Sequence, residues 1–323
     1  MKSATLREIA ALAFLAFFAD AAAAQSYPNK PVRFIVPFGP GGPGDAVGRM
    51  IGRKLTETLG QPVVIDNRSG ATTIIGTELV ARSPPDGYTL LLISTTHAVN
   101  PSLFQKLPYD PIKDFAPVTM ITYTPFMLVI HPSIAANSVP ELVSLARSKP
   151  GQLNYGSSGN GSSIHLTTEL FKTAAKIEMT HVPYKGSGPA FIDLIGGQVQ
   201  VLFSSTVSSL PHVKSGKVRG LAITSPKRAA ALPAVPTVAE FYPGFESSSW
   251  FGLLVPAKTP RPIIERLLAD TRAALNSSDV SQSLISQGAE PAGNSPAEFG
   301  AYFDTEIKKW RSVIKAAGIK LEQ

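Results

Sequence analysis

A loop rich in glycine and proline follows the first apolar run of the chain, and its residue types are suited to binding an anion. The run Val32–Phe38 leads into Gly39-Pro40-Gly41-Gly42-Pro43-Gly44, and Asp45 then stands where a helix N-cap is expected. The start of a helix presents backbone N–H groups that lack carbonyl partners, together with the positive end of the helix dipole. The loop therefore predicts a site for a small anion above the end of a strand.

The same loop also fits the dinucleotide-binding pattern G-x-G-x-x-G. Asp66 ends the next predicted strand at about the distance, roughly 20 residues, where such folds place an acidic residue. Against this, Pro40 and Pro43 remove two N–H donors from the loop that would hold the pyrophosphate. We favour binding of an anion such as a carboxylate, and a dinucleotide site or a purely rigid turn remain the alternatives.

A second polar loop, Tyr155–Ser162, has the composition of a nest of backbone and hydroxyl donors at a helix start. It is not a nucleophile elbow, because Asn160 stands where that motif needs glycine. The five histidines form neither H-x-x-x-H nor H-E-x-x-H, so the sequence predicts no metal site and no cofactor. A Ser-His-Asp triad, whose members need not be close in sequence, stays open as an enzyme alternative.

Composition narrows the function classes further. The sequence contains no cysteine, which excludes disulfides, thiolate catalysis and a lipid anchor on cysteine. The net charge is +7, but lysine and arginine are spread along the chain instead of forming a run, so we expect a solvated basic surface and no nucleic-acid partner.

The N-terminus reads as an export signal. Lys2 and Arg7 precede the uncharged apolar run Ile9–Ala19, and small residues end at Ala24, so we expect cleavage near Ala24/Gln25. The run is shorter than the roughly 20 residues that span a bilayer. The sequence therefore predicts a signal peptide over 1–24 and a mature protein in the periplasm.

Strand and helix patterns alternate along the rest of the chain, which favours parallel sheets. The segment Phe115–Ile130 is apolar and rich in β-formers, and we expect it to leave a first lobe and enter a second one. The chain returns near Thr224–Pro226. Loops at the carboxyl ends of the strands then face a cleft between the lobes. The predicted elements are strands Val32–Phe38, Pro62–Asp66, Tyr88–Ile93, Leu153–Gly156, Met179–Tyr184, Val199–Phe203 and Val218–Thr224, and helices Asp45–Leu59, Ile74–Arg82, Val139–Ser148, 163–175, 185–197, Pro262–Asn276 and Pro296–Ala316, with 94–101 as a loop.

Short motifs along nearly the whole mature chain resemble one family, the substrate-binding receptors of tripartite tricarboxylate transporters, called Bug or TctC proteins. The residues that carry the resemblance are Pro28–Pro31, Gly41-Gly42 with Asp45 and Arg49, 59–64, Asn67-Arg68, Gly70-Ala71 and Gly76, 86–91, Asn100-Pro101, 182–186, 196–199, 221–224, and Pro236-Thr237 with Glu240.

The resemblance implies a two-lobed α/β fold of the type II periplasmic-binding-protein kind, each lobe a mostly parallel sheet flanked by helices. The implied division is lobe 1 over 25–124 and 225–285, lobe 2 over 125–224, and a C-terminal helical segment over 286–323. It also implies a non-enzymatic receptor that closes on a small carboxylate and delivers it to the transporter's membrane subunits, and we expect a monomer. The site residues that the resemblance implies are Phe38, Gly39, Pro40, Gly41, Gly42, Asp45, Thr95, Thr96, His97, Ser157, Ser158, Asn160, Gly161, Ser162, Lys185, Gly186, Ser187, Gly188 and Ser205.

Two positions depart from the family pattern. Ser204 and Ser205 stand where an acidic residue is common, and the loop Gly70–Thr73 lacks the usual following glycines. Both leave the identity of the carboxylate open. An exported enzyme, a dinucleotide-binding protein and the periplasmic subunit of a sensor remain the alternative functions.

Overall fold

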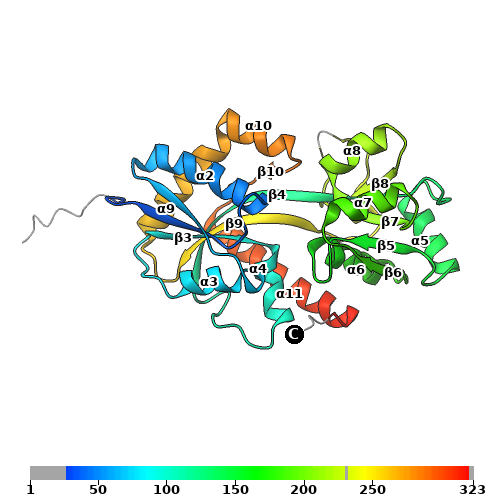
Figure 1. Ribbon diagram of the computed structural model, residues 1–323, viewed down its shortest axis with the longest axis horizontal. Helices are drawn as coiled ribbons and strands as arrows, with labels where there is room; N and C mark the ends of the chain where they lie inside the picture. Colours follow the sequence, from blue (N-terminus) through cyan, green and yellow to red (C-terminus); the bar gives the residue numbers. More distant parts are fainter. Residues whose placement is uncertain (1–26, 230–231, 320–323) are drawn as a thin grey trace, which may run out of the picture.

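The chain folds into two α/β lobes that lie side by side (Figure 1). The computed structural model describes residues 27–229 and 232–319, so the predicted signal segment 1–24 lies outside the described residues. Two long strands, β4 (Phe115–Ile130) and β9 (Ser248–Pro256), run between the lobes. None of the helices in the described part of the chain combines the length and the apolar character needed to cross a membrane.

The first lobe begins with the predicted alternation of strands and helices. Its elements are β1 (Val32–Val36), α2 (Pro43–Leu59), β2 (Val63–Asn67), the short helix η1 (Ala71–Thr73), α3 (Ile74–Ala81), β3 (Thr89–Ser94) and α4 (Thr95–Leu103). Strand β1 lies between β2 and β3 and is parallel to both, with Val32 opposite Val63 and Arg33 opposite Thr89. Because β9 then pairs antiparallel with β3, the sheet is mixed.

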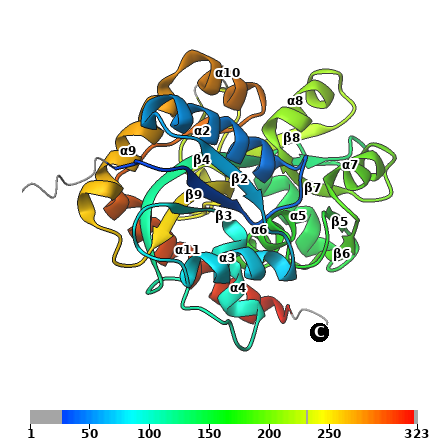
Figure 2. The same cartoon turned by 60° about the vertical axis from the view of Figure 1, so that its left-hand side comes forward.

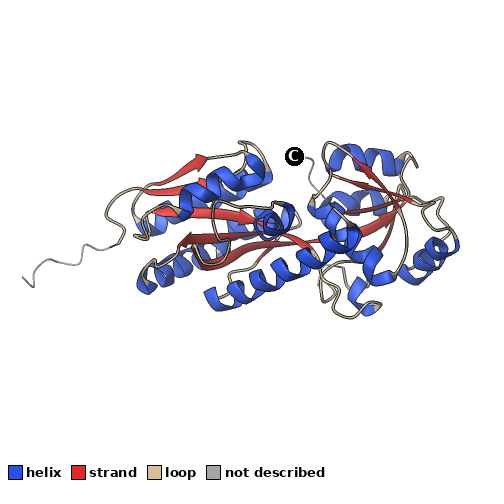
Figure 3. Cartoon of the chain, turned by 90° about the horizontal axis from the view of Figure 1, so that it is seen from below, coloured by secondary structure: helices blue, strands red, loops and turns tan. Residues whose placement is uncertain are grey.

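The second lobe repeats this arrangement on a smaller sheet, and helices flank the strands of both lobes (Figures 2 and 3). Its elements are α5 (Val139–Ser148), β5 (Asn154–Ser157), α6 (Ser163–Ala175), β6 (Thr180–Pro183), α7 (Ser187–Ile195), β7 (Val201–Ser205), α8 (Thr206–Lys214) and β8 (Arg219–Ile223). Strand β5 is parallel to β6 and β7, whereas β7 and β8 are antiparallel to the end of β4.

After β8 the chain first adds η2 (Val238–Glu240) to the second lobe. After β9 it covers the first lobe and the junction with α9 (Arg261–Asn276), α10 (Ser278–Ser286), β10 (Glu290–Pro291) and α11 (Pro296–Ala317). Helix α11 packs on α4 and β4 and also contacts α6 of the second lobe. The predicted helices Pro262–Asn276 and Pro296–Ala316 match α9 and α11. Helices α8 and α10 and strand β9 are not among the elements predicted from the sequence.

Strand β4 changes partners in the middle, which defines the junction. Its residues up to Pro125 pair with β9, and those from Phe126 onward pair with β7 and β8. The buried hydroxyl of Thr224 accepts a hydrogen bond from the Phe126 N–H (2.8 Å) and donates one to the Ser247 carbonyl (2.6 Å). Thr224 therefore links the two chain segments that run between the lobes, at Phe126 and at Ser247.

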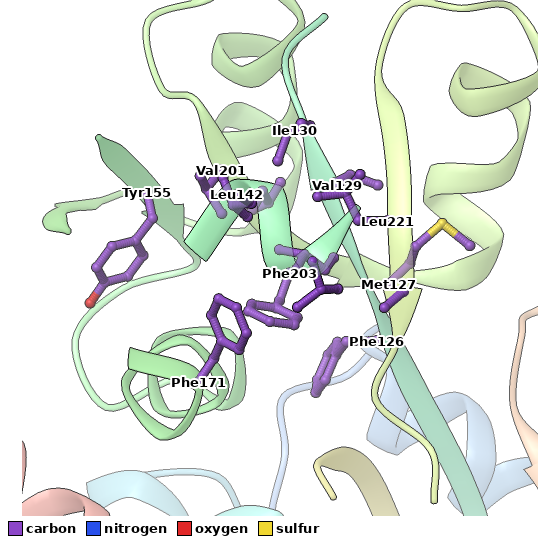
Figure 4. Close-up of a cluster of buried hydrophobic side chains, with 14 of the residues drawn as sticks. Phe126, Met127, Val129, Ile130, Leu142, Tyr155, Phe171, Val201, Phe203 and Leu221 are labelled. Atoms are coloured by element: carbon purple, nitrogen blue, oxygen red, sulfur yellow. The ribbon is translucent and has the colours of Figure 1, made fainter. Parts of the chain in front are cut away.

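Each lobe has its own apolar core. The predicted stripe Val47, Ile51, Leu55 and Leu59 of α2 is buried against the first sheet, and the helix ends at Gly60 with a left-handed φ of 67°. The second core gathers Phe126, Leu142, Phe171 and Phe203 between its sheet and helices (Figure 4). Independent cores are what allow two lobes to move as separate bodies.

Val238 and Phe245 lie in the core of the second lobe, although the predicted division places residues 225–285 in the first. We propose on this basis that the chain returns to the first lobe at β9 instead of at residue 225. The two tryptophans have packing roles, because Trp250 and Trp310 are fully buried and both donate their indole N–H to Glu306.

Two local predictions were wrong. The segment 94–101 is not an exit loop, because α4 begins directly after β3, with the Ser94 hydroxyl accepting the Thr96 N–H as a cap. Helix α2 begins at Pro43, and Gly42 is its N-cap, so Asp45 lies in the first turn instead of capping the helix. Proline suits the first helical position because its φ is preset and its missing N–H would have no partner there.

Candidate functional site

A cleft at the junction of the lobes contains two adjoining hollows of about 420 and 380 Å³. Both hollows are lined by Pro43, Ser163, Ser249 and Phe251, so they form one continuous depression with two compartments. The first compartment is further lined by Phe38, Gly39, Gly42, Gly44, Ser94, Thr95, Thr96, Val99, Gly161 and Ser162. The second is further lined by Val47, Thr122, Thr124, Phe126, Ser158, Ile164, Ser187, Ser204, Ser205, Ser208, Leu284, Gln287 and Ala289.

Five helices begin at this cleft. Residues from the first turns of α2, α4 and α6 line the first compartment, and Ser187 of α7 and Ser205 before α8 line the second. Among the described residues, no acidic or basic side chain lines either compartment. The cleft therefore combines partial positive charge from helix ends with hydroxyl donors, and it contains no full charge of its own.

The five helix starts differ in how their first N–H groups are satisfied. Hydroxyls of Ser94, Ser162 and Ser205 cap α4, α6 and α8 by accepting N–H groups of their first turns. Helices α2 and α7 begin at Gly42 and Gly186, which provide no side-chain cap. One uncapped helix start thus stands in each lobe, free to donate to a ligand.

In the first lobe, Asp45 holds the glycine-proline loop 39–44 in place. Its carboxylate is 4 % exposed and accepts hydrogen bonds from the Gly41 N–H (2.9 Å), from Arg49 Nε (2.9 Å) and from Asn67 Nδ2 (2.8 Å). The hydrogen bond from Arg49, and after it the one from Gly41, lowers the pKa of Asp45 to about 2. Asp45 and Gly41 therefore position the loop and do not line the cleft.

The loop of the second lobe is fixed in a similar way. The Ser162 hydroxyl accepts the His165 N–H (3.3 Å), and in return His165 Nδ1 accepts the Gly161 N–H (3.0 Å). Ser157 is fully buried, and its hydroxyl accepts the Gly159 N–H (3.1 Å). These contacts hold the loop 157–162, called the Gly/Ser loop below, in the shape that presents Gly161 and Ser162 to the first compartment.

The structure brings about half of the predicted site residues to the cleft and places the others elsewhere. Those that line it are Phe38, Gly39, Gly42, Thr95, Thr96, Ser158, Gly161, Ser162, Ser187 and Ser205. Those outside its lining are Pro40, Gly41, Asp45, His97, Ser157, Asn160, Lys185, Gly186 and Gly188.

His97 is a clear correction to the predicted wall. Because the segment is a helix, the ring turns away from the face that Thr95 and Thr96 present, and it is only 1 % exposed. It stacks between Tyr109 and Phe303, and Nε2 lies 3.2 Å from the Pro111 carbonyl. Burial lowers the pKa of His97 to about 4, as expected for a neutral core histidine.

Sequence reasoning missed the residues that distant strands bring to the cleft. Ser249 and Phe251 come from β9, and Thr122 and Thr124 come from β4. The available signal was the alternation of Thr122 and Thr124 around Tyr123, together with three consecutive serines at 247–249 before an apolar run. Only the pairing of β4 with β9 shows that these residues meet.

The side chains that a serine triad or a dinucleotide site would use have other surroundings in this structure. No group of three or more His, Asp or Glu side chains in the described part of the chain is arranged to hold a metal ion. Ser157 Oγ and His181 Nε2 lie 2.6 Å apart, but the serine is fully buried and cannot reach a substrate. Asp66, which would contact a ribose, instead pairs with Arg33 and Arg68.

Comparisons with known proteins agree with this geometry. The family described as "Tripartite tricarboxylate transporter family receptor" matches residues 47–319. The protein BugT of Bordetella pertussis is 40 % identical over 93 % of this chain and 93 % of its own. A protein of R. palustris that was solved with adipate is 41 % identical with a TM-score of 0.73, covering 91 % of this chain and 100 % of that one.

A solute-binding protein from Polaromonas, solved with no ligand, is 27 % identical with a TM-score of 0.82, covering 90 % of this chain and 100 % of that one. These proteins match this one over both lobes and the junction. The chain therefore belongs to the receptor family of the tripartite tricarboxylate transporters, whose members are periplasmic solute-binding proteins.

Proposed function

We propose that this protein captures a small carboxylate between its two lobes and delivers it unchanged to the membrane subunits of a tripartite transporter. The observation that carries the proposal is the cleft itself, in which five helices begin and which none of the described charged side chains lines. Uncapped helix starts and hydroxyl groups can bind a carboxylate without help from arginine. The adipate-bound relative supports this ligand class.

The energetics of such a site are sufficient. A hydrogen bond to a charged group contributes about 1.5–3 kcal/mol, and a helix N-terminus adds about 0.3–1 kcal/mol. Four such hydrogen bonds contribute about 6–12 kcal/mol, a range that includes the roughly 8 kcal/mol of a micromolar complex.

We further propose that the described arrangement is the open form. The ligand-free Polaromonas protein superposes better than the adipate-bound protein, although its sequence is less similar. This difference in TM-score supports an orientation of the lobes like that of the ligand-free protein. Closure would bring Gly161 and Ser162 of the second lobe toward Gly42 and Thr95 of the first.

Location and partners follow from the same proposal. We expect export with cleavage near Gln25, and a monomer in the periplasm whose partners are its ligand and the membrane subunits. No cofactor is required for capture and release.

Thermal denaturation of residues 25–323 against a panel of acids and their neutral amides tests the proposal. Adipate at 100 times its dissociation constant should stabilise the fold by about 2.7 kcal/mol, and hexanediamide should not. Mass spectrometry of the released ligand should return the acid intact. Stabilisation by NAD and by none of the acids, or a chemically altered ligand, would contradict the receptor function.

A further inference from the structure

Two histidines outside the cleft lining form a stacked pair beneath the Gly/Ser loop of the second lobe. The rings of His165 on α6 and His181 on β6 are 4.0 Å apart with an angle of 6° between their planes. Tyr155 of β5 packs against both rings, with its ring centroid 4.8 Å from that of His181 and 6.3 Å from that of His165. In Figure 4 the Tyr155 hydroxyl points away from the other labelled core side chains, and it donates to Glu169 at 2.5 Å.

Each histidine contacts the loop through a different ring nitrogen. His165 uses Nδ1 to accept the N–H of Gly161, which has a left-handed φ of 72°. His181 uses Nε2, which lies 2.6 Å from the hydroxyl that accepts the Gly159 N–H. The two rings together therefore fix both glycines that shape this side of the cleft.

The two contacts respond differently to a proton. A protonated His165 would carry N–H at Nδ1, facing the Gly161 N–H, and the hydrogen bond would be lost. A protonated His181 could donate to Ser157, whose hydroxyl can donate in turn to the Gly159 carbonyl at 3.2 Å. Neutrality is therefore required at His165 only.

The groups that face the pair favour the neutral form. Burial and the neighbouring His181 lower the pKa of His165 to about 4, with Glu169 opposing and Lys172 adding to the shift. Burial also lowers the pKa of His181. Tyr155 carries no charge because burial raises its pKa, and Glu169 is paired with Lys172 at 2.8 Å.

We propose that His165 and His181 are positioning residues, which hold the Gly/Ser loop in its ligand-binding shape through Nδ1 of one ring and Nε2 of the other. The inference rests on the proposed carboxylate receptor, and it goes beyond it by assigning affinity to residues that do not touch the ligand. It also sets a direction for the effect of pH. Acid weakens anion binding through His165, whereas a histidine in direct contact with an anion would strengthen binding when protonated.

Crossed amide substitutions test the proposal, because asparagine places a polar atom near the Nδ1 position and glutamine near the Nε2 position. His165→Asn should bind adipate at least tenfold more tightly than His165→Gln. The order should reverse at the other ring, with His181→Gln at least tenfold tighter than His181→Asn. His131→Asn, on a half-buried histidine of the same lobe that lies outside the cleft lining, should leave affinity unchanged. Equal affinities of the amides at each position, or the opposite order, would overturn the proposal.

A readout without ligand keeps this test separate from the proposed function. The amide proton of Gly161 should exchange slowly in the wild type and in His165→Asn, and at least tenfold faster in His165→Gln. Its NMR signal should shift as pH falls toward 4 in the wild type and stay constant in His165→Asn. If adipate does not bind but these exchange rates hold, the receptor function fails and the positioning pair stands. A Gly161 amide signal that stays unchanged while His165 becomes protonated would overturn the positioning role of His165.

Discussion

The two lobes fix their cleft loops with the same device built from different chemistry. In each lobe a left-handed glycine precedes the N-cap, and the third helical residue reaches back to accept its N–H: Asp45 for Gly41 at 2.9 Å, and His165 for Gly161 at 3.0 Å. The aspartate is an ionised acceptor and the histidine a neutral one. The shape of the cleft therefore depends on two groups that lose their function at different pH values.

The largest expected effect is the pH dependence of folding through His165. Its pKa is about 4 in the folded protein and about 6.5 when unfolded, so the unfolded chain binds more protons and stability falls as pH drops through this range. The loss should reach roughly 3 kcal/mol between pH 6.5 and 4. Urea unfolding at pH 6.5 and at pH 4 should show this loss of unfolding free energy in the wild type and not in His165→Asn. Equal losses in the two proteins would contradict a role of His165.

The corresponding window for Asp45 lies lower. Its pKa is lowered to about 2 in the folded protein, so its contribution is complete above the ordinary value of 3.8 and is lost as pH falls through 2. At pH 7, Asp45→Ala should reduce the free energy of unfolding by about 2 kcal/mol, because three donors lose a charged acceptor. Asp304→Ala, on an exposed face of α11, serves as the control. Equal losses for the two variants would show that Asp45 does not fix the loop.

A smaller loss of stability is expected when α6 loses its side-chain cap, which α2 does not have. Ser162→Ala removes the cap of α6 and should cost about 1 kcal/mol in unfolding free energy. The same change at exposed Ser286, which caps no helix, should leave stability nearly unchanged. Thermal unfolding of the two variants checks this. An unchanged unfolding free energy in Ser162→Ala would show that the Ser162 cap does not stabilise α6.

The smallest stability change sharpens the comparison most. Gly42→Ser has room for its side chain, since a Cβ there meets only the Gly39 carbonyl at 3.6 Å, and its hydroxyl can cap α2. Stability should rise by a few tenths of a kcal/mol. Affinity for the carboxylate should fall, because the cap uses an N–H group that the ligand needs. Calorimetric titration measures this, and unchanged affinity would show that the α2 start does not bind the ligand.

The sequence could predict elements whose signal is local. The stripe Val47, Ile51, Leu55 and Leu59 followed by Gly60 specifies α2 without any other part of the chain. Helix α4 could not be predicted in this way, because Pro101 and two threonines interrupt its pattern and its stability comes from aromatic residues packed around His97. Tertiary packing, and not propensity, decides such a helix.

The candidate site divides along the same line. The Gly/Ser loops were visible because glycine and serine at strand ends have a direct structural meaning. Ser249 and Phe251 were not, because β9 reaches the cleft from more than 150 residues beyond Thr95. The roles of Asp45 and His165 also depend on which way a side chain turns at a helix start, and the residue types alone do not specify that direction.

The most direct test of the central claim is a crystal structure grown with the acid that stabilises the protein most. We predict closed lobes, with carboxylate oxygens accepting hydrogen bonds from N–H groups at the starts of α2 and α7 and from hydroxyl groups of residues such as Thr95, and with no arginine or lysine in contact. A ligand held by a basic side chain, or bound outside this cleft, would contradict it.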